Sequence, residues 1–120
     1  MSRIINFASK LKKFSDYWSP KIIAIMNDYE FKVVKIKGEF IWHNHKETDE
    51  VFIVLEGSMS IKLKNKTLNI NKGEMIVIKS GEQHKPFANN ECHILIIEPK
   101  GVINTGEAGL ELTSDNEIWI

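Results

Sequence analysis

Most of the chain after residue 21 alternates between short runs of β-forming residues and turn residues such as Gly38, Gly57 and Gly73. Within the run at 59–64, apolar residues take one parity and Ser or Lys the other, which is typical of a half-buried strand. No segment long enough for a crossover helix separates the runs, so a parallel βαβ sheet is not expected. The pattern predicts an all-β sandwich or barrel with strands at 22–26, 29–37, 40–45, 50–55, 59–63, 67–70, 75–78 and 93–97.

The residues before this region follow a different period. Phe7, Leu11 and Phe14 recur at helical spacing, and Asn6 stands where an N-cap is preferred. We therefore predict a short amphipathic helix over 7–14, within an N-terminal arm that covers 1–21.

Three of the predicted strands, at 51–55, 75–78 and 94–97, are apolar on both parities. Such strands need cover on both faces. One face can fill the barrel interior, while the other must meet the N-terminal segment, a second sheet or a second subunit. We therefore predict a homodimer that buries these strands or an outward surface formed by Phe40 and Trp42.

The turn signals contain no internal repeat and no linker. The prediction is a single domain over 1–120, with the barrel at about 22–98 and an irregular C-terminal tail at 99–120.

Composition narrows the class of protein more than its function. The 120 residues are 42% hydrophobic, enough for one core, and Cys92 is the only cysteine, so no internal disulfide can form. Cys92 is expected to be buried and inert, and a reducing cytoplasm is the expected location. We see neither the apolar run of a signal peptide nor one of the length that spans a bilayer.

Charge gives no sign of a polyanionic partner. Sixteen basic and sixteen acidic residues balance to zero, so neither nucleic acid nor a membrane surface is expected as a partner. The lysines between Lys32 and Lys72 are interpreted as a solvated outer face rather than a binding patch.

Candidate chemistry is concentrated in the histidines. His43 and His45 are two residues apart in a predicted strand, so both rings project from one face, and Glu50 follows after a polar stretch suited to a turn. His84 comes later, beside another turn. Three imidazoles and one carboxylate suit Fe²⁺, Mn²⁺, Zn²⁺, Ni²⁺ or Cu²⁺. On spacing alone a polar strand end explains the pattern equally well, and both interpretations stay open.

The glycines around these residues carry a family resemblance. Gly38, His43, His45, Glu50 and Gly57 together resemble the first motif of the cupin superfamily: a glycine, His-x-His, four residues, Glu, six residues and a glycine.

A second segment is similar to the second cupin motif, in which a glycine is followed by five residues and Pro-x-Gly-x-x-His. Gly73, Gly81 and His84 match it, and the short spacing between the motifs resembles small single-domain bacterial cupins. The resemblance implies a double-stranded β-helix, a jelly-roll-like barrel, that holds one divalent metal ion through His43, His45, Glu50 and His84.

The chain departs from these motifs at three places. Four residues rather than five separate Gly38 from His43, Lys79 stands in place of Pro, and Ala88 replaces the final Asn. Each ligand position is retained. The first two departures affect the shape of turns and the third removes a polar side chain, so none of them argues against metal binding.

Two function hypotheses follow. The first is a metalloenzyme with a mononuclear centre that acts on a small polar substrate, with dioxygenase-like or isomerase-like chemistry. The second is a non-catalytic module that binds a metal or a small ligand such as a sugar. A structural cupin without metal is disfavoured by the complete ligand set. Cupins host many reactions, so the motifs do not choose among them.

Several other residues are weaker candidates. Gln83, His93 and Trp42 are candidates to line the pocket, and His93 is alternatively a core residue. Phe40 and Trp42 are expected to point outward. Glu47 and Asp49 are alternatives to Glu50 as the carboxylate ligand of the metal, but as turn residues they are expected to be exposed to solvent.

Overall fold

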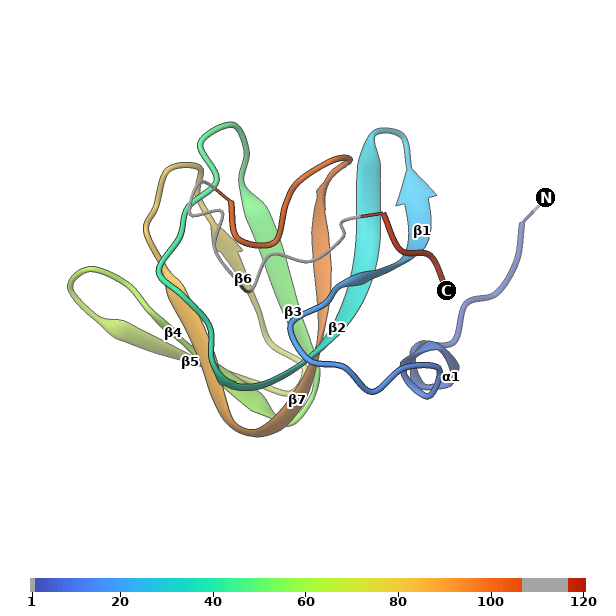
Figure 1. Cartoon of the computed structure of the whole chain (residues 1–120), viewed down its shortest axis with the longest axis horizontal. Coiled ribbons are helices and arrows are strands. Elements are labelled where there is room, and N and C mark those ends of the chain that lie inside the picture. The colour runs from blue at the N-terminus through green and yellow to red at the C-terminus, as the bar shows by residue number, and fades with distance from the viewer. Residues whose placement is uncertain (1, 107–116) are drawn as a thin grey trace.

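The computed structural model describes residues 2–106 and 117–120, and its strands form an antiparallel sheet curled into a barrel (Figure 1). The main path of hydrogen-bonded strands runs β1-β2-β7-β3-β6, and β4 pairs with both β5 and β7. The all-β prediction with a short N-terminal helix is confirmed. The elements are α1 (Phe7–Leu11), β1 (Lys21–Met26), β2 (Tyr29–Glu39), β3 (Glu50–Glu56), β4 (Ser58–Lys62), β5 (Thr67–Asn71), β6 (Met75–Ile78) and β7 (Lys85–Pro99).

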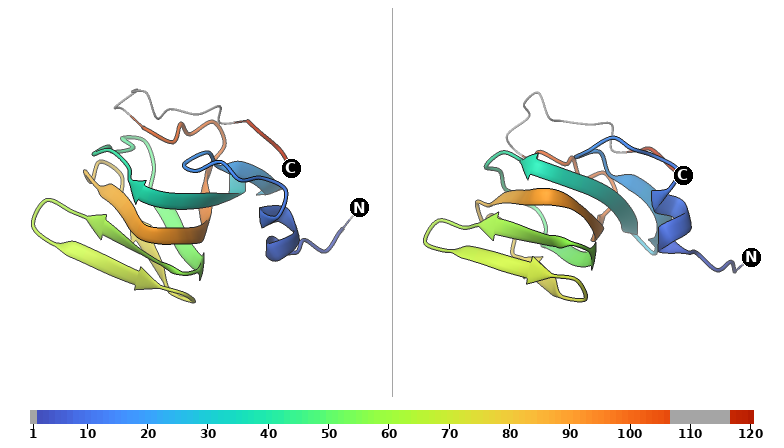
Figure 2. Two further views of the ribbon diagram at one scale, coloured as in Figure 1. Left: turned by 60° about the horizontal axis from the view of Figure 1, so that its bottom comes forward. Right: turned by 90° about the horizontal axis from the view of Figure 1, so that it is seen from below.

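Strand β7 joins the two halves of the barrel. Its first residues pair with β4, its later residues pair with β3, and β2 follows it along the other edge. Figure 2 shows β2, β7 and the β4–β5 hairpin side by side. The sequence predicted only 93–97 of this strand, because 85–92 is too polar to show an apolar run; pairing with neighbours extends it.

Helix α1 ends earlier than predicted, at Leu11 instead of residue 14. Asn6 is the N-cap as expected, and its side chain accepts a hydrogen bond from the backbone N–H of Ser9 at 2.9 Å. Phe14 lies beyond the helix, and its carbonyl accepts a hydrogen bond from Lys35 Nζ of β2 at 2.6 Å. The helix lies outside the barrel, beside β1 and β2 (Figure 1).

The predicted strand at 40–45 does not form. The chain is extended there, but only His43 makes a ladder contact, an isolated antiparallel bridge to His84. A register shift at the end of β2, where Gly38 has a positive φ of 79°, directs the chain out of the sheet.

Apolar residues form two clusters on opposite faces of the sheet. One fills the barrel interior and includes Cys92, Ile94 and Ile96; the other, which includes Leu11 and Leu95, packs α1 against β1, β2 and β7. The N-terminal segment therefore covers the outer face of the 94–97 run. Cys92 is buried as predicted, and burial raises the pKa of its thiol to about 11.

The outer face of β6 has no such cover within the described residues. Met75 is 56% exposed and Val77 is 42% exposed, whereas Ile78 is buried on the inner face. Within the described residues, the fold of one chain thus buries the inner side of the apolar run at 75–78 and leaves its outer side exposed.

The C-terminal region is irregular only in part. Residues 100–106 form turns, and residues 107–116 of the predicted tail lie outside the described residues. At the end, Ile22 of β1 donates its N–H to Ile118 at 2.7 Å and accepts from Ile120 at 3.2 Å. The last residues therefore pair with β1.

None of the helices in the described ranges is long and apolar enough to cross a bilayer.

Candidate metal centre

The four predicted ligand residues converge inside the barrel. His43, His45, Glu50 and His84 are all buried, and each offers a ligand atom within 4.8 Å of the others. Glu50 Oε2 lies 3.3 Å from His45 Nε2, and Glu50 Oε1 lies 3.8 Å from His84 Nε2. These separations are those of donor atoms around a common centre rather than of a packed ion pair.

Backbone hydrogen bonds hold the two motifs together. His43 and His84 exchange reciprocal bonds, with N···O distances of 3.0 and 2.9 Å, and the Gly81 N–H donates to the His45 carbonyl at 2.9 Å. The histidines of the first motif are therefore fixed relative to His84 although the segment that carries them is not a strand.

Two of the rings are oriented by the backbone. The Nδ1 atoms of His43 and His84 lie 2.9 and 2.8 Å from the carbonyl oxygens of Ile41 and Glu82. A carbonyl can only accept, so Nδ1 carries the proton in each ring and Nε2 keeps its lone pair. This arrangement is typical of metal-ligating histidines, whose second nitrogen donates to a carbonyl or carboxylate.

Ligand atoms in this cluster are buried without partners. Among the described residues, His45 Nε2, Glu50 Oε1 and His84 Nε2 have no hydrogen bond. A buried polar atom without a partner costs free energy, and three of them aimed at one point would be satisfied together by one cation. The donor set therefore fits a divalent metal ion.

The protonation states also suit coordination. Burial, followed by repulsion from His84, lowers the pKa of His43 to about 4, so its ring is neutral near pH 7. Burial raises the pKa of Glu50, but the nearby polar groups of Glu98, His45 and His84 together outweigh burial and hold the pKa well below the ordinary value. Neutral imidazoles and an ionised carboxylate are the forms that bind metal.

Three charged residues that the sequence analysis missed lie beside this cluster. Glu30, Lys32 and Glu98 are buried in the barrel, and Lys32 Nζ is 2.9 Å from Glu98 Oε1 and 3.6 Å from Glu30 Oε1. Burial, followed by the nearby charge of Glu50, raises the pKa of Glu98 well above its ordinary value, so this carboxyl holds its proton more strongly than a solvated one. Lys32 is thus an exception to the predicted solvated lysine face.

A signal for these residues was present in the sequence. Glu30 and Lys32 share parity with the interior residues Val34 and Ile36, and Glu98 continues the interior parity of Ile94 and Ile96. Charged residues at core parity indicate a paired or functional cluster.

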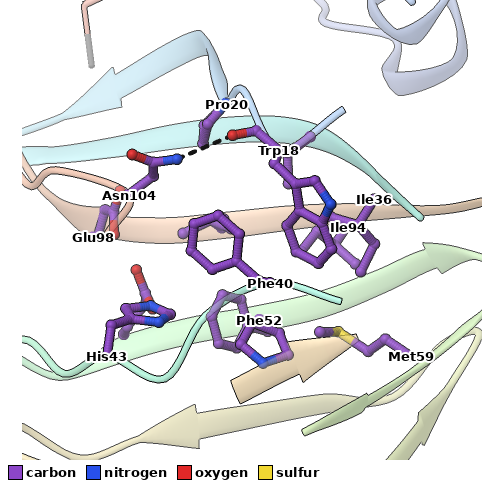
Figure 3. Close-up of a pocket in the computed structure, with 14 residues that line it drawn as sticks. Trp18, Pro20, Ile36, Phe40, His43, Phe52, Met59, Ile94, Glu98 and Asn104 are labelled. Carbon is purple, nitrogen blue, oxygen red and sulfur yellow. Dashed lines mark hydrogen bonds between the residues drawn. The ribbon is translucent and has the colours of Figure 1, made fainter. Parts of the chain in front are cut away.

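A cavity of about 40 Å³ opens beside the candidate ligands (Figure 3). Its wall is mostly apolar, and His43, Glu50 and Glu98 contribute carboxyl and imidazole groups to it. The remaining lining residues are Trp18, Pro20, Val34, Ile36, Phe40, Phe52, Met59, Pro86, Ile94, Ile96 and Asn104.

The prediction that Phe40 faces outward is wrong, because the bend after β2 turns it inward. Its ring is buried, lines the cavity and packs edge-on against His43 with centroids 5.2 Å apart. Trp42 is 44% exposed, as expected for an outward residue, and does not line the cavity.

The other candidate residues also lie away from the cavity. Gln83 is exposed, and His93 is on the outer face of β7, where its Nε2 lies 2.7 Å from Glu91 Oε2. The expectation that His93 faces the barrel interior or its core is therefore wrong. Glu47 and Asp49 are exposed, and Asp49 Oδ1 accepts a hydrogen bond from the Ser80 N–H at 2.9 Å.

Gly106, beyond the second motif, packs against the loop that carries His45. A Cβ on Gly106 would collide with the carbonyl oxygen of Asn44 and would lie 3.1 Å from His45 Nδ1. Replacing Gly106 with Ala is expected to displace His45 and weaken metal binding roughly 10-fold to 100-fold, the usual effect of disturbing a ligand's support. Competition with a chelating dye measures the affinity.

Gly101→Ala is the matched control for this change. Gly101 also has a positive φ, 88°, but a Cβ there would meet nothing within 4 Å. It carries the same backbone strain without the contact, so its metal affinity should match that of the wild type. Equal loss in both variants would show that strain, not contact with the His45 loop, is responsible.

Comparisons with known proteins agree with the fold. The model of the cupin domain family matches residues 31–98. The protein YdbB of Bacillus subtilis strain 168, described as uncharacterized, is 31% identical over 101 residues, which cover 83% of this chain and 87% of that protein.

Two solved structures extend the comparison. A cupin-2 domain protein from Shewanella frigidimarina NCIMB 400 is 52% identical with a TM-score of 0.80, covering 81% of this chain and 95% of that chain. Protein NMB1881 from Neisseria meningitidis is 30% identical with a TM-score of 0.75, covering 82% of this chain and 100% of that chain. With the family model spanning more than half of its length, this chain belongs to the cupin family.

Proposed function

We propose that the protein is a small metalloenzyme that binds one divalent metal ion through His43, His45, Glu50 and His84. The observation that carries this proposal is the set of buried ligand atoms without partners, which lie beside a cavity. An ion held there would supply Lewis-acid or redox chemistry to a ligand in that cavity.

A catalytic role is favoured over a binding role by a second carboxyl group in the cavity wall. Glu98 lines the cavity without being one of the four candidate ligands, and Lys32 holds its Oε1 at 2.9 Å. Its other oxygen, Oε2, has no hydrogen bond from the described residues. Glu98 is therefore placed to give a proton to a ligand in the cavity or to take one from it.

The alternative, a sugar-binding module, is disfavoured by the size and the wall of the cavity. About 40 Å³ is far below the roughly 300 Å³ of typical small-molecule sites. The mostly apolar wall also offers few partners for the hydroxyl groups of a sugar. A substrate with a few non-hydrogen atoms, with its polar group toward Glu50 and Glu98, fits better.

The test begins with the metal. Protein purified without added metal is analysed for bound ions by mass spectrometry, then loaded separately with Fe²⁺, Mn²⁺, Zn²⁺, Ni²⁺ and Cu²⁺. A panel of small substrates is screened for turnover with each loaded form. We expect one ion per chain and metal-dependent turnover. Failure to bind any divalent ion would overturn the proposal, and binding without turnover would favour the non-catalytic alternative.

Glu30→Gln provides a matched control for the role of Glu98. Both carboxylates are buried and both pair with Lys32, but only Glu98 lines the cavity. With metal content retained in both variants, Glu98→Gln is expected to lose turnover and Glu30→Gln to keep it. Equal loss would mean that Glu98 acts only on stability.

We also propose that a second copy of the chain covers the outer face of β6, so that the protein is a homodimer in the cytoplasm with a small-molecule ligand. The exposed Met75 and Val77 support this, as does the position of β6 at the end of the main strand order.

Light scattering at micromolar concentration should give twice the 13.8 kDa mass of one chain. Val77→Glu is expected to shift the protein to monomer, because it places a charge in the apolar contact. Ile25→Glu changes a side chain of equal exposure, 42%, on β1 and should leave the dimer intact. A wild-type protein with the mass of one chain would contradict the prediction.

A further inference from the structure

The cavity beside the candidate metal centre is bounded by a pair of stacked aromatic rings. Trp18 and Phe40 have centroids 4.8 Å apart and planes inclined by 21°. Both line the cavity, and Phe40 also contacts His43 edge-on. Figure 3 shows the two rings side by side between β2 and the strands below it.

Trp18 is fixed in place by its backbone and by its indole. Its N–H donates to the Lys35 carbonyl at 2.9 Å, and its Nε1–H donates to the Lys37 carbonyl at 3.0 Å. Its own carbonyl accepts a hydrogen bond from Asn104 Nδ2 at 3.0 Å, the dashed line in Figure 3. A residue held by two backbone hydrogen bonds and one from its indole is a wall and not a mobile lid.

The backbone of Trp18 shows that this placement has a cost. Its φ is +61°, a left-handed conformation that is uncommon for a bulky residue. Such conformations are strained and persist where the surroundings impose them, often at functional sites. The three hydrogen bonds to β2 and Asn104 supply that constraint.

The space left by this wall is small. A volume of about 40 Å³ is far below the roughly 300 Å³ of a typical small-molecule site, so a ligand with an aromatic ring does not fit. We propose that the Trp18–Phe40 stack is a size filter that restricts the candidate metal centre to ligands of a few non-hydrogen atoms, one of which can bind the metal. This inference rests on the proposed function, because it requires a metal ion at that centre.

A second pocket contacts less of the candidate centre. The larger pocket of about 360 Å³, lined by 45–48, 99–103 and Gly106, touches only His45 among the four candidate ligands. The cavity beside Trp18 touches both His43 and Glu50. Of these two pockets of the described residues, the one beside Trp18 is therefore the better route to the metal.

Trp18 and Asn104 also lie outside residues 31–98, which match the family model. Phe40 lies within the matched residues, so the filter combines a residue of the cupin domain with a Trp18 that the flanking segments hold against the barrel.

The test uses protein loaded with Co²⁺, whose visible spectrum responds to ligands on the metal. Azide is the small probe, and 4-phenylimidazole is the large one. For the wild type, azide should change the spectrum and 4-phenylimidazole should not. Trp18→Ala should bind 4-phenylimidazole at least tenfold more tightly than the wild type, while azide affinity changes less than threefold.

Trp42→Ala is the matched control, because it removes an indole that does not line the cavity. It should behave as the wild type toward both probes. Trp18→Leu retains an apolar side chain, so it keeps the test open if Trp18→Ala does not fold, and it should show an intermediate gain.

Three results would overturn the filter: strong 4-phenylimidazole binding to the wild type, the same gain in Trp42→Ala, or no gain in either Trp18 variant. A wild-type protein that binds no Co²⁺ would instead contradict the proposed function itself.

Discussion

Replacing His84 with Ala is expected to abolish tight metal binding and to remove most of the stability that a metal ion adds. An ion at 100 times its dissociation constant adds about 2.7 kcal/mol to the free energy of unfolding. For a domain of this size that corresponds to a melting temperature roughly 10 °C higher. His84 is fully buried and is the only candidate ligand from the second motif, so its loss leaves that side of the centre open.

The measurements are metal content and melting temperature, each with and without added ion, in matched buffers. His93→Ala is the control, since His93 lies on the outer face of β7 and pairs with Glu91. It should keep both the ion and the increase in melting temperature. If His84→Ala retains its metal while His93→Ala loses it, the ligand assignment is wrong.

Replacing Lys32 with Met should destabilise the fold strongly, by about 3–5 kcal/mol, as is usual when one partner of a buried ion pair is removed. Lys32 lies between Glu30 and Glu98, and all three side chains are at most 2% exposed. Without the ammonium group, two buried carboxyl groups lose their cationic partner. Urea denaturation at pH 7 measures the change in free energy of unfolding.

An exposed pair gives the contrast. Lys72 and Glu56 are 3.0 Å apart but 65% and 62% exposed, so Lys72→Met should change stability by no more than about 1 kcal/mol. Adding Glu30→Gln to Lys32→Met should recover part of the loss, because one uncompensated charge is then removed. If Lys32→Met were no more destabilising than Lys72→Met, the buried cluster would not contribute the predicted amount, roughly 3–5 kcal/mol, to the free energy of unfolding.

Local spacing predicted the barrel and placed His43 and His45 on one side of the chain, while the resemblance to the cupin motifs completed the ligand set with Glu50 and His84, which the structure brings together. His43 and His45 lie on one side of an extended chain whether or not that chain is a strand. The alternation of apolar and polar residues did not show which side chains face the barrel interior where both sides of a strand are apolar. In the 93–97 run both faces are apolar, and only the pairing of β7 with β2 and β3 shows that Ile94 and Ile96 are interior while His93 is not.

The remaining features depend on contacts that no local pattern contains. Trp18 reaches the cavity through hydrogen bonds to β2 and to Asn104, which is 86 residues away. Gly106 matters because a loop from the other motif passes beside it. Phe40 was misassigned because the register shift near Gly38 ends the alternation that the prediction assumed.

The buried carboxyl groups beside the candidate metal centre have a consequence for the sign of charge that the barrel interior accepts. Three carboxyl groups, those of Glu30, Glu50 and Glu98, share this interior with one ammonium group, that of Lys32. Because uncompensated charge in a protein interior is strongly unfavourable, a cation beside Glu50 lessens the excess of acidic groups, whereas an anion alone adds to it. The interior is therefore expected to favour a cation and to disfavour an anionic ligand until a cation is bound.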